Sequence, residues 1–285
     1  MKKIVLIIIT LVTVQSISAQ WAKGKGKGFY KLSAWYLNTD QHYTDTGEID
    51  PNATRTQFNL NLYAEYGLTN RLDIVTYLPF FARVTQNNQV SGTVGTILQE
   101  GEAVNSIGDI DLGLSYNFYK TDGVTLASRI MLGLPTGENS GGSDGSYQTG
   151  DGEFNQYISV LGGFSLKLFE LPAYAKTYLG YNNRTEGFSD ELRYGIELGA
   201  NLIRDKLWTL VRFDNVSSMK NGTLDATTAQ GSIFANNVEY LGISVEASYY
   251  LSKKLGVSFN YGGAVSGRII AANPSFSAGI FLDIK

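Results

Sequence analysis

The sequence predicts an all-β fold, a transmembrane antiparallel up-and-down β-barrel of about 12 strands with long extracellular loops and short periplasmic turns. Three observations predict it. Long segments alternate strictly between apolar and polar residues, which is typical of strands with one apolar face. The connections between these segments alternate between long and short. The sequence also contains no apolar run of about 18 residues, the length that a transmembrane helix requires.

The clearest alternation lies at 107–137. From 110 to 118 every even position is apolar or aromatic, whereas the odd positions carry Asp, Gly, Ser and Asn. A turn at 120–123 ends in Gly123, which tolerates the positive φ of a tight reversal. A second alternating run returns over 124–134. A tilted strand needs roughly 9–11 residues to cross a bilayer, so this pair is long enough to span one.

The same pattern predicts the remaining strands in chain order, after a solvated Lys-Gly lead-in at 23–28 that matches no phosphate-binding spacing. The twelve predicted strands are 30–36, 58–66, 72–80, 110–118, 124–134, 153–167, 173–182, 192–202, 207–215, 237–250, 257–265 and 274–284. The long polar loops are predicted at 38–56, 83–106, 138–152 and 215–236. Three short turns, at 68–72, 203–207 and 251–255, share one pattern and are assigned to the periplasmic side with both termini.

A soluble β-sandwich or a lipocalin-like barrel is the alternative fold. Strands of soluble sheets usually have about five or six residues, whereas many segments here are longer. Aromatic residues also cluster beside the short turns, where an interfacial girdle is expected. These aromatic residues are Tyr66, Phe118, Tyr119, Phe169, Tyr249 and Tyr250. The membrane barrel is therefore the preferred interpretation.

The first residues have the features of a cleaved signal peptide. Lys2 and Lys3 precede an apolar run at 4–14, which is too short for a membrane-spanning helix, and the predicted cleavage follows Ala19. We expect a signal peptide at 1–19 and a single barrel domain at 20–285, exported to the bacterial outer membrane with its lipid as partner. The chain has no cysteine, so disulfides are excluded. The formal net charge of −3 argues against nucleic acid as a partner.

Few residues could support catalysis or bind a metal. His42 is the only histidine, and its polar surroundings predict an exposed loop residue and not a catalytic base. Transition-metal sites are improbable with this composition. The Asp-rich segments 45–50 and 144–151 could offer oxygen ligands to calcium, but neither has EF-hand spacing. We expect no catalytic residue, no metal site and no cofactor.

The polar faces of the predicted strands carry charges of both signs that should point into the lumen. These candidate pore-lining residues are Lys31, Glu65, Asp73, Asp109, Asp111, Arg129, Lys176, Arg193, Glu197, Arg212 and Glu246. They could form paired charges that only support the barrel, or a polar pathway that sets selectivity. A barrel of about eight strands fills with side chains and one of sixteen leaves a wide channel, so any pore here should be narrow.

Three segments carry a resemblance to a known family. The segments 108–114 (GDIDLGL), 132–137 (LGLPTG) and 66–72 (YGLTNRL) are similar to bacterial outer-membrane proteins of the "MetA-pathway of phenol degradation" type. The resemblance implies an outer-membrane transporter, in some members linked to the degradation of aromatic compounds. The 18–20 region is similar to exported proteins of the Bacteroidetes. The chain departs from many such barrels because it ends in Lys285 and not in an aromatic residue.

These observations predict a channel or transporter for the passive passage of small solutes and not an enzyme. The resemblance implies that these solutes include small aromatic or hydrophobic compounds. Two alternatives stay open: a sealed structural or adhesive barrel that acts through its loops, and a lipid-active barrel enzyme.

Overall fold

The computed structural model describes residues 22–224 and 232–285. The predicted signal peptide and its cleavage site therefore lie outside the described residues. Within the described ranges there is no helix with the length and hydropathy needed to cross a membrane. The strands are β1 (Gly28–Tyr43), β2 (Ile49–Gly67), β3 (Leu72–Gln86), β4 (Gln89–Val90), β5 (Ile97–Gln99), β6 (Glu102–Ser106), β7 (Ile110–Lys120), β8 (Val124–Leu134), β9 (Asn155–Leu168), β10 (Leu171–Asn183), β11 (Glu191–Ile203), β12 (Leu207–Ser218), β13 (Glu239–Tyr250), β14 (Leu255–Arg268), β15 (Ile270–Ala271) and β16 (Ser275–Ile284).

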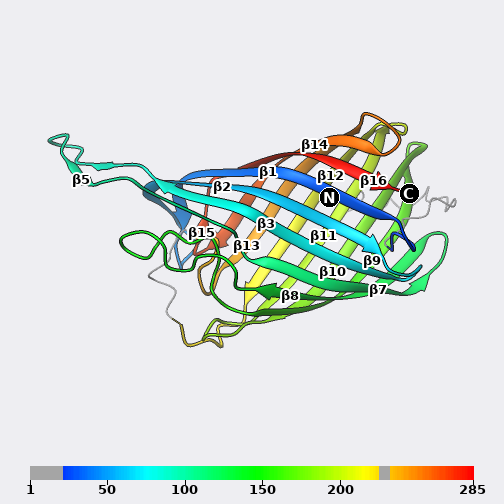
Figure 1. The fold of residues 1–285 in the computed structure, drawn as a ribbon, viewed down its shortest axis with the longest axis horizontal. Helices are drawn as coiled ribbons and strands as arrows, with labels where there is room; N and C mark the ends of the chain where they lie inside the picture. Colours follow the sequence, from blue (N-terminus) through cyan, green and yellow to red (C-terminus); the bar gives the residue numbers. More distant parts are fainter. Residues whose placement is uncertain (1–21, 225–231) are drawn as a thin grey trace, which may run out of the picture.

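Twelve antiparallel strands of the described chain close into a barrel, as the sequence predicted. Each pairs with its neighbours along the chain, and β1 closes the sheet by pairing with both β2 and β16. The closing register matches Lys31 with Phe281 on one side and with Tyr63 on the other. The start of the described chain lies beside the β2–β3 turn, where the N–H of Gly26 donates to the Gly67 carbonyl. The C-terminal end also lies near the short turns, whereas the long connections gather at the opposite, extracellular end (Figure 1). Closure leaves no open edge in the membrane-spanning wall.

The alternation places apolar side chains on the outside of the barrel. On β7 and β8, Leu112 and Ile130 are 43% and 54% exposed, whereas Ser115 and Ala127 on the opposite face are 7% and 1% exposed. The same face of the other strands carries exposed Leu, Ile, Val and Phe side chains. So large an apolar surface is unfavourable in water and matches the acyl chains of a bilayer. The outward surface is thus the lipid-facing one.

The short turns lie where the sequence predicted them. The β7–β8 hairpin keeps the predicted turn, with Thr121 N–H donating to the Val124 carbonyl at 2.8 Å. The β9–β10 connection is tighter than expected, because only Phe169 and Glu170 link the two strands. Both residues have positive φ, at 48° and 65°. This is the left-handed pair of a two-residue hairpin turn, a conformation that glycine or asparagine usually provides.

Two of the predicted long loops are largely strand. The prediction of a loop at 38–56 is wrong, since β1 continues to Tyr43 and β2 begins at Ile49. The prediction of a loop at 83–106 is wrong in part, since β3 continues to Gln86 and its outer end pairs with β6. These extensions carry few apolar residues because they project beyond the bilayer, so backbone pairing continues where apolar alternation stops. The β4–β5 hairpin extends furthest from the barrel (Figure 1).

Two side chains differ from their predicted surroundings. His42 was expected to be exposed in a loop, but it lies in β1, pairs in register with Asp50 and Ala271, and is only 6% exposed. Tyr250 was expected in the outer girdle, but it faces the lumen and its hydroxyl donates to Asp283 at 2.8 Å. Its neighbour Tyr249 is the outward residue and is exposed. The other proposed girdle residues are exposed as predicted.

Candidate functional site

The lumen contains two large cavities, one towards each end of the barrel. The inner cavity, about 580 Å³, lies in the periplasmic half, and its lining includes Phe29 of β1 and Asp283 of β16. The outer cavity, about 550 Å³, lies in the extracellular half and includes Trp35 and Tyr240. On four strands the two linings are consecutive inward positions: Ser33 and Trp35, Lys176 and Tyr178, Arg212 and Asp214, Glu246 and Ser244. The cavities therefore lie end to end along the barrel axis.

A ladder of alternating charges crosses one wall of the inner cavity. Lys31 contacts Glu246 at 2.9 Å, and Arg212 contacts the other oxygen of Glu246 at 3.0 Å. Arg212 also contacts Glu197 at 2.5 Å, and Lys176 lies 3.3 Å from Glu197. Four of the five residues, Glu246, Arg212, Glu197 and Lys176, come from the neighbouring strands β13, β12, β11 and β10. Lys31 of β1 reaches Glu246 across the two strands β16 and β14 that lie between them. Each carboxylate thus has two cationic partners, which offsets the cost of removing it from water.

The opposite wall is organised around Glu65 of β2. Its carboxylate lies 3.0 Å from Lys23 Nζ and 3.6 Å from Arg129 Nη2. The hydroxyl of Tyr63 donates to the same carboxylate. Arg129 also lines the outer cavity, so this group connects the two cavities. The backbone N–H of Lys23 donates to Asp73 at 2.9 Å, which ties the start of the described chain to the barrel wall.

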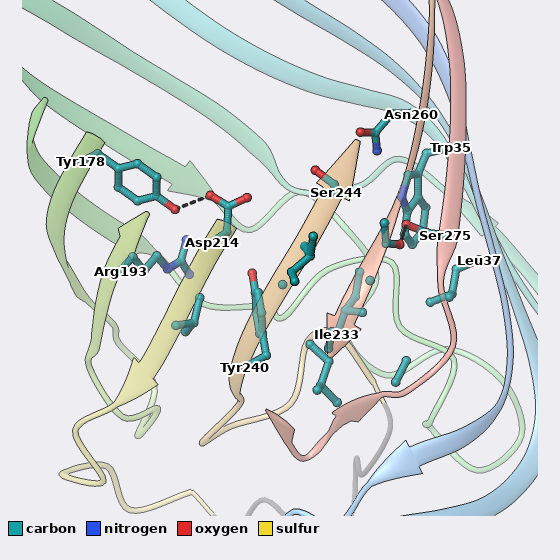
Figure 2. A pocket seen from close by; sticks show the side chains of 18 of the residues that line it. Trp35, Leu37, Tyr178, Arg193, Asp214, Ile233, Tyr240, Ser244, Asn260 and Ser275 are labelled. Carbon is teal, nitrogen blue, oxygen red and sulfur yellow. Dashed lines mark hydrogen bonds between the residues drawn. The ribbon is translucent and has the colours of Figure 1, made fainter. Parts of the chain in front are cut away.

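The outer cavity combines aromatic and aliphatic walls with a few polar groups (Figure 2). Tyr178 donates to Asp214 at 2.7 Å, and Arg193 lies beside this pair. Leu37 and Val216 point inward and are buried, although inward positions of a water-filled barrel are normally polar. A concave site with apolar walls and a few convergent polar groups has the character of a small-molecule site.

The β8–β9 connection folds inward at the extracellular mouth. Arg55, on the inner face of β2, donates from Nη1 to the Ser146 carbonyl at 2.9 Å and from Nη2 to Ser146 Oγ at 2.8 Å. Its guanidinium lies 4.8 Å from the ring centre of Tyr147, which is fully buried. Gln148 accepts a hydrogen bond from Ser232, so the connections before β9 and β13 meet over the mouth. Ile233, next to Ser232, lines the outer cavity from this end (Figure 2).

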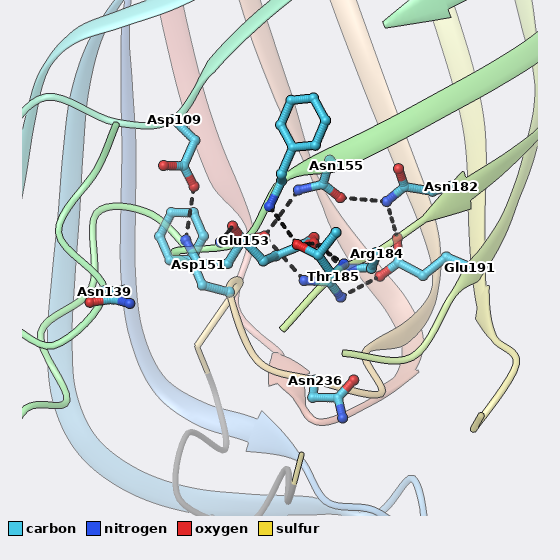
Figure 3. A network of polar contacts seen from close by, with 12 residues as sticks. Asp109, Asn139, Asp151, Glu153, Asn155, Asn182, Arg184, Thr185, Glu191 and Asn236 are labelled. Atoms are coloured by element: carbon cyan, nitrogen blue, oxygen red, sulfur yellow. Dashed lines mark hydrogen bonds and ion pairs between the residues drawn. The ribbon is translucent and has the colours of Figure 1, made fainter. Parts of the chain in front are cut away.

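A second anchor of the same connection is centred on Arg184 (Figure 3). Its side chain is only 4% exposed and contacts Glu153 at 2.7 Å, Glu191 at 3.0 Å and Asp151 at 3.1 Å. Burial raises the pKa of Glu153 above its usual value, against the hydrogen bonds from Arg184 and Thr185 that lower it. Removing Arg184 would leave the buried carboxylates of Glu153 and Glu191, and the partly buried one of Asp151, without this shared cation.

The structure brings most of the predicted pore-lining residues to the two cavities. Those that line the inner cavity are Lys31, Glu65, Lys176, Glu197, Arg212 and Glu246, and those that line the outer cavity are Arg129 and Arg193. Asp73, Asp109 and Asp111 are not among the lining residues of either cavity. Asp109 instead accepts hydrogen bonds from the backbone N–H of Gly137 and of Asp151, both at 2.8 Å.

Sequence reasoning missed the aromatic and acidic part of the outer cavity. Trp35, Tyr178 and Asp214 occupy inward positions of predicted strands, so the alternation alone could have identified them. The Arg55 contact could not be identified in this way, because its partner lies 91 residues away in an irregular connection.

The fold and its apolar exterior define a β-barrel protein of the bacterial outer membrane. The sequence matches no family model, and no curated protein matches it. An outer membrane channel from Pseudomonas putida F1 has a similar structure, with a TM-score of 0.62, 15% sequence identity, and coverage of 94% of this chain and 99% of that chain. The NanC and KdgM porins are similar at 9% and 8% identity over 90% of this chain and 99% of each of theirs. Their TM-scores are 0.48 and 0.46.

Proposed function

We propose that the barrel is an outer-membrane channel for the passive, non-enzymatic passage of small solutes. The observation that carries this proposal is the end-to-end arrangement of the two cavities inside a closed barrel. Because paired charges and aromatic rings line this space, the available path is narrow and suits small molecules. Candidate pore-lining residues are those of the ladder and of the Glu65 group, with Arg193 in the outer cavity.

The solutes include small aromatic or hydrophobic compounds. The apolar walls of the outer cavity, with Trp35, Leu37 and Val216, support this assignment. The resemblance of the 108–114 and 132–137 segments to the "MetA-pathway of phenol degradation" family points in the same direction.

A sealed barrel that acts through its loops is the second candidate. It is favoured by the inward fold of the β8–β9 connection, which Arg55 and Arg184 hold at the mouth. The lipid-active enzyme receives no support, since the only histidine is buried in a strand.

Liposome swelling separates the two candidates. Liposomes with the wild-type protein should swell in small neutral sugars, and replacing 140–148 by a short Gly-Ser linker should accelerate swelling by removing the inward segment. Replacing 90–98 is the matched control, because that hairpin projects away from the barrel and should leave the rate unchanged (Figure 1). If neither the wild type nor the 140–148 variant admits any sugar, the barrel is sealed.

A further inference from the structure

The lumen exposes its cations more than its carboxylates, although the two are paired. The side chain of Lys176 is 40% exposed, whereas that of its partner Glu197 is 14% exposed. Arg193 is 39% exposed and its partner Glu191 only 5%. Arg212, Lys23 and Arg129 are likewise more exposed than the acids they contact. In each of these ion pairs the cation is therefore the partner that a solute inside the barrel reaches more readily.

Hydrogen bonds within the barrel wall explain why the carboxylates are less exposed to the lumen than the cations. Glu197 accepts from Arg212 and from the hydroxyl of Tyr174, and Lys176 is its second cation. Glu246 accepts from Lys31, Arg212 and Ser248. The carboxylate oxygens of Glu197 and Glu246 thus already accept hydrogen bonds from other groups of the barrel wall. An arginine or lysine head retains donors after making one ion pair, so it can still bind an anion.

The exposed cations also continue from one cavity to the next. Arg193 and Arg129 line the outer cavity, and Arg212, Lys176, Lys31 and Lys23 line the inner one. Asp214 is the acid of the outer cavity; one of its oxygens accepts from Tyr178, and the two arginines of that cavity oppose its charge. An anion leaving Arg193 would therefore meet further cations before it reaches the periplasmic end.

We propose that the lumen prefers small organic anions, carboxylates in particular, and that Arg193, Lys176 and Arg212 determine this preference. The inference rests on the proposed channel function and names its solute class. Guanidinium groups match the geometry of a carboxylate with paired donors, and lysine adds a compact charge. The apolar walls beside Arg193 accept the uncharged part of such a molecule.

Reversal potentials in planar bilayers test the proposal. In a potassium chloride gradient near 0.1 M, the wild type should favour chloride over potassium by at least about two-fold, and the preference should weaken near 1 M, where the Debye length falls to about 3 Å. Replacing chloride by benzoate should retain an anion current. The double variant Lys176→Gln, Arg193→Gln should lose most of the preference. In this variant Glu197 keeps Arg212 and Glu191 keeps Arg184, so neither acid is left without a cation.

The matched control is Lys253→Gln, Lys254→Gln, which removes the same charge from an exposed periplasmic turn and should leave the reversal potential unchanged. A wild-type channel that conducts without anion preference overturns this inference and leaves the channel function standing. Chloride current without benzoate current overturns the carboxylate assignment. A wild type that never conducts overturns the proposed function, and this inference with it.

Discussion

Arg55 of β2 and Ser146 of the β8–β9 connection are joined by two hydrogen bonds of 2.9 and 2.8 Å across the mouth of the lumen. Hydrogen bonds from a charged donor contribute about 1.5–3 kcal/mol. Arg55→Ala should therefore release the inward connection and increase single-channel conductance or the time spent open. Arg83→Ala is the control, because Arg83 of β3 is exposed and contacts Asn105 of the paired strand β6 at 2.7 Å, away from the inward connection. Equal traces from both variants and the wild type would mean that this connection does not limit passage.

The orientation of the strand faces can be tested with a pair of charged substitutions. Leu112→Arg places a charge on the lipid side, where the cost near the bilayer midplane is ~2–4 kcal/mol. Ser33→Arg places the same charge in the inner cavity, where water is accessible and the cost should be smaller. Urea unfolding in detergent, followed by tryptophan fluorescence, compares the two unfolding free energies. A larger loss for Ser33→Arg would reverse the assignment of faces.

Asp109 should make the stability of the extracellular side depend on pH. It precedes β7, outside the membrane-spanning strands, and burial raises its pKa to about 6, with repulsion from Asp151 adding to the increase and two backbone N–H donors opposing it. Between the usual value near 4 and about 6, the folded chain binds more protons than the unfolded chain. The free energy of unfolding contributed by this group therefore rises as the pH falls through that window.

The variant Asp109→Asn cannot titrate, so its unfolding free energy should rise less than that of the wild type between pH 7 and pH 5. Asp122→Asn, in the exposed β7–β8 turn, should follow the wild type. Identical pH dependence for the wild type and Asp109→Asn would show that this carboxyl titrates at its usual pH in the folded protein.

The sequence predicted the parts of the fold that the bilayer dictates. The β8 strand spans the predicted 124–134 segment, because lipid on one side and lumen on the other impose strict alternation there. Outside the bilayer that constraint disappears, so the outer ends of β1 and β2 were expected as loop. The contact between Arg55 and Ser146 depends on the path of an irregular connection, which no local pattern encodes. The order of the charges in the ladder likewise depends on the register between several strands. The periodicity of the sequence predicts only which residues of each strand face inward.

The most direct test of the central claim is chemical block of the lumen. The chain has no cysteine, so Ser244→Cys places a single thiol in the wall of the outer cavity, next to the inner one. Treating open single channels with a bulky methanethiosulfonate reagent should reduce the conductance in one step, because the adduct would occupy the path. The control Leu112→Cys places the thiol on the lipid side, so the same treatment should leave its conductance unchanged. An unchanged Ser244→Cys conductance, with mass spectrometry confirming complete modification, would contradict passage through this lumen.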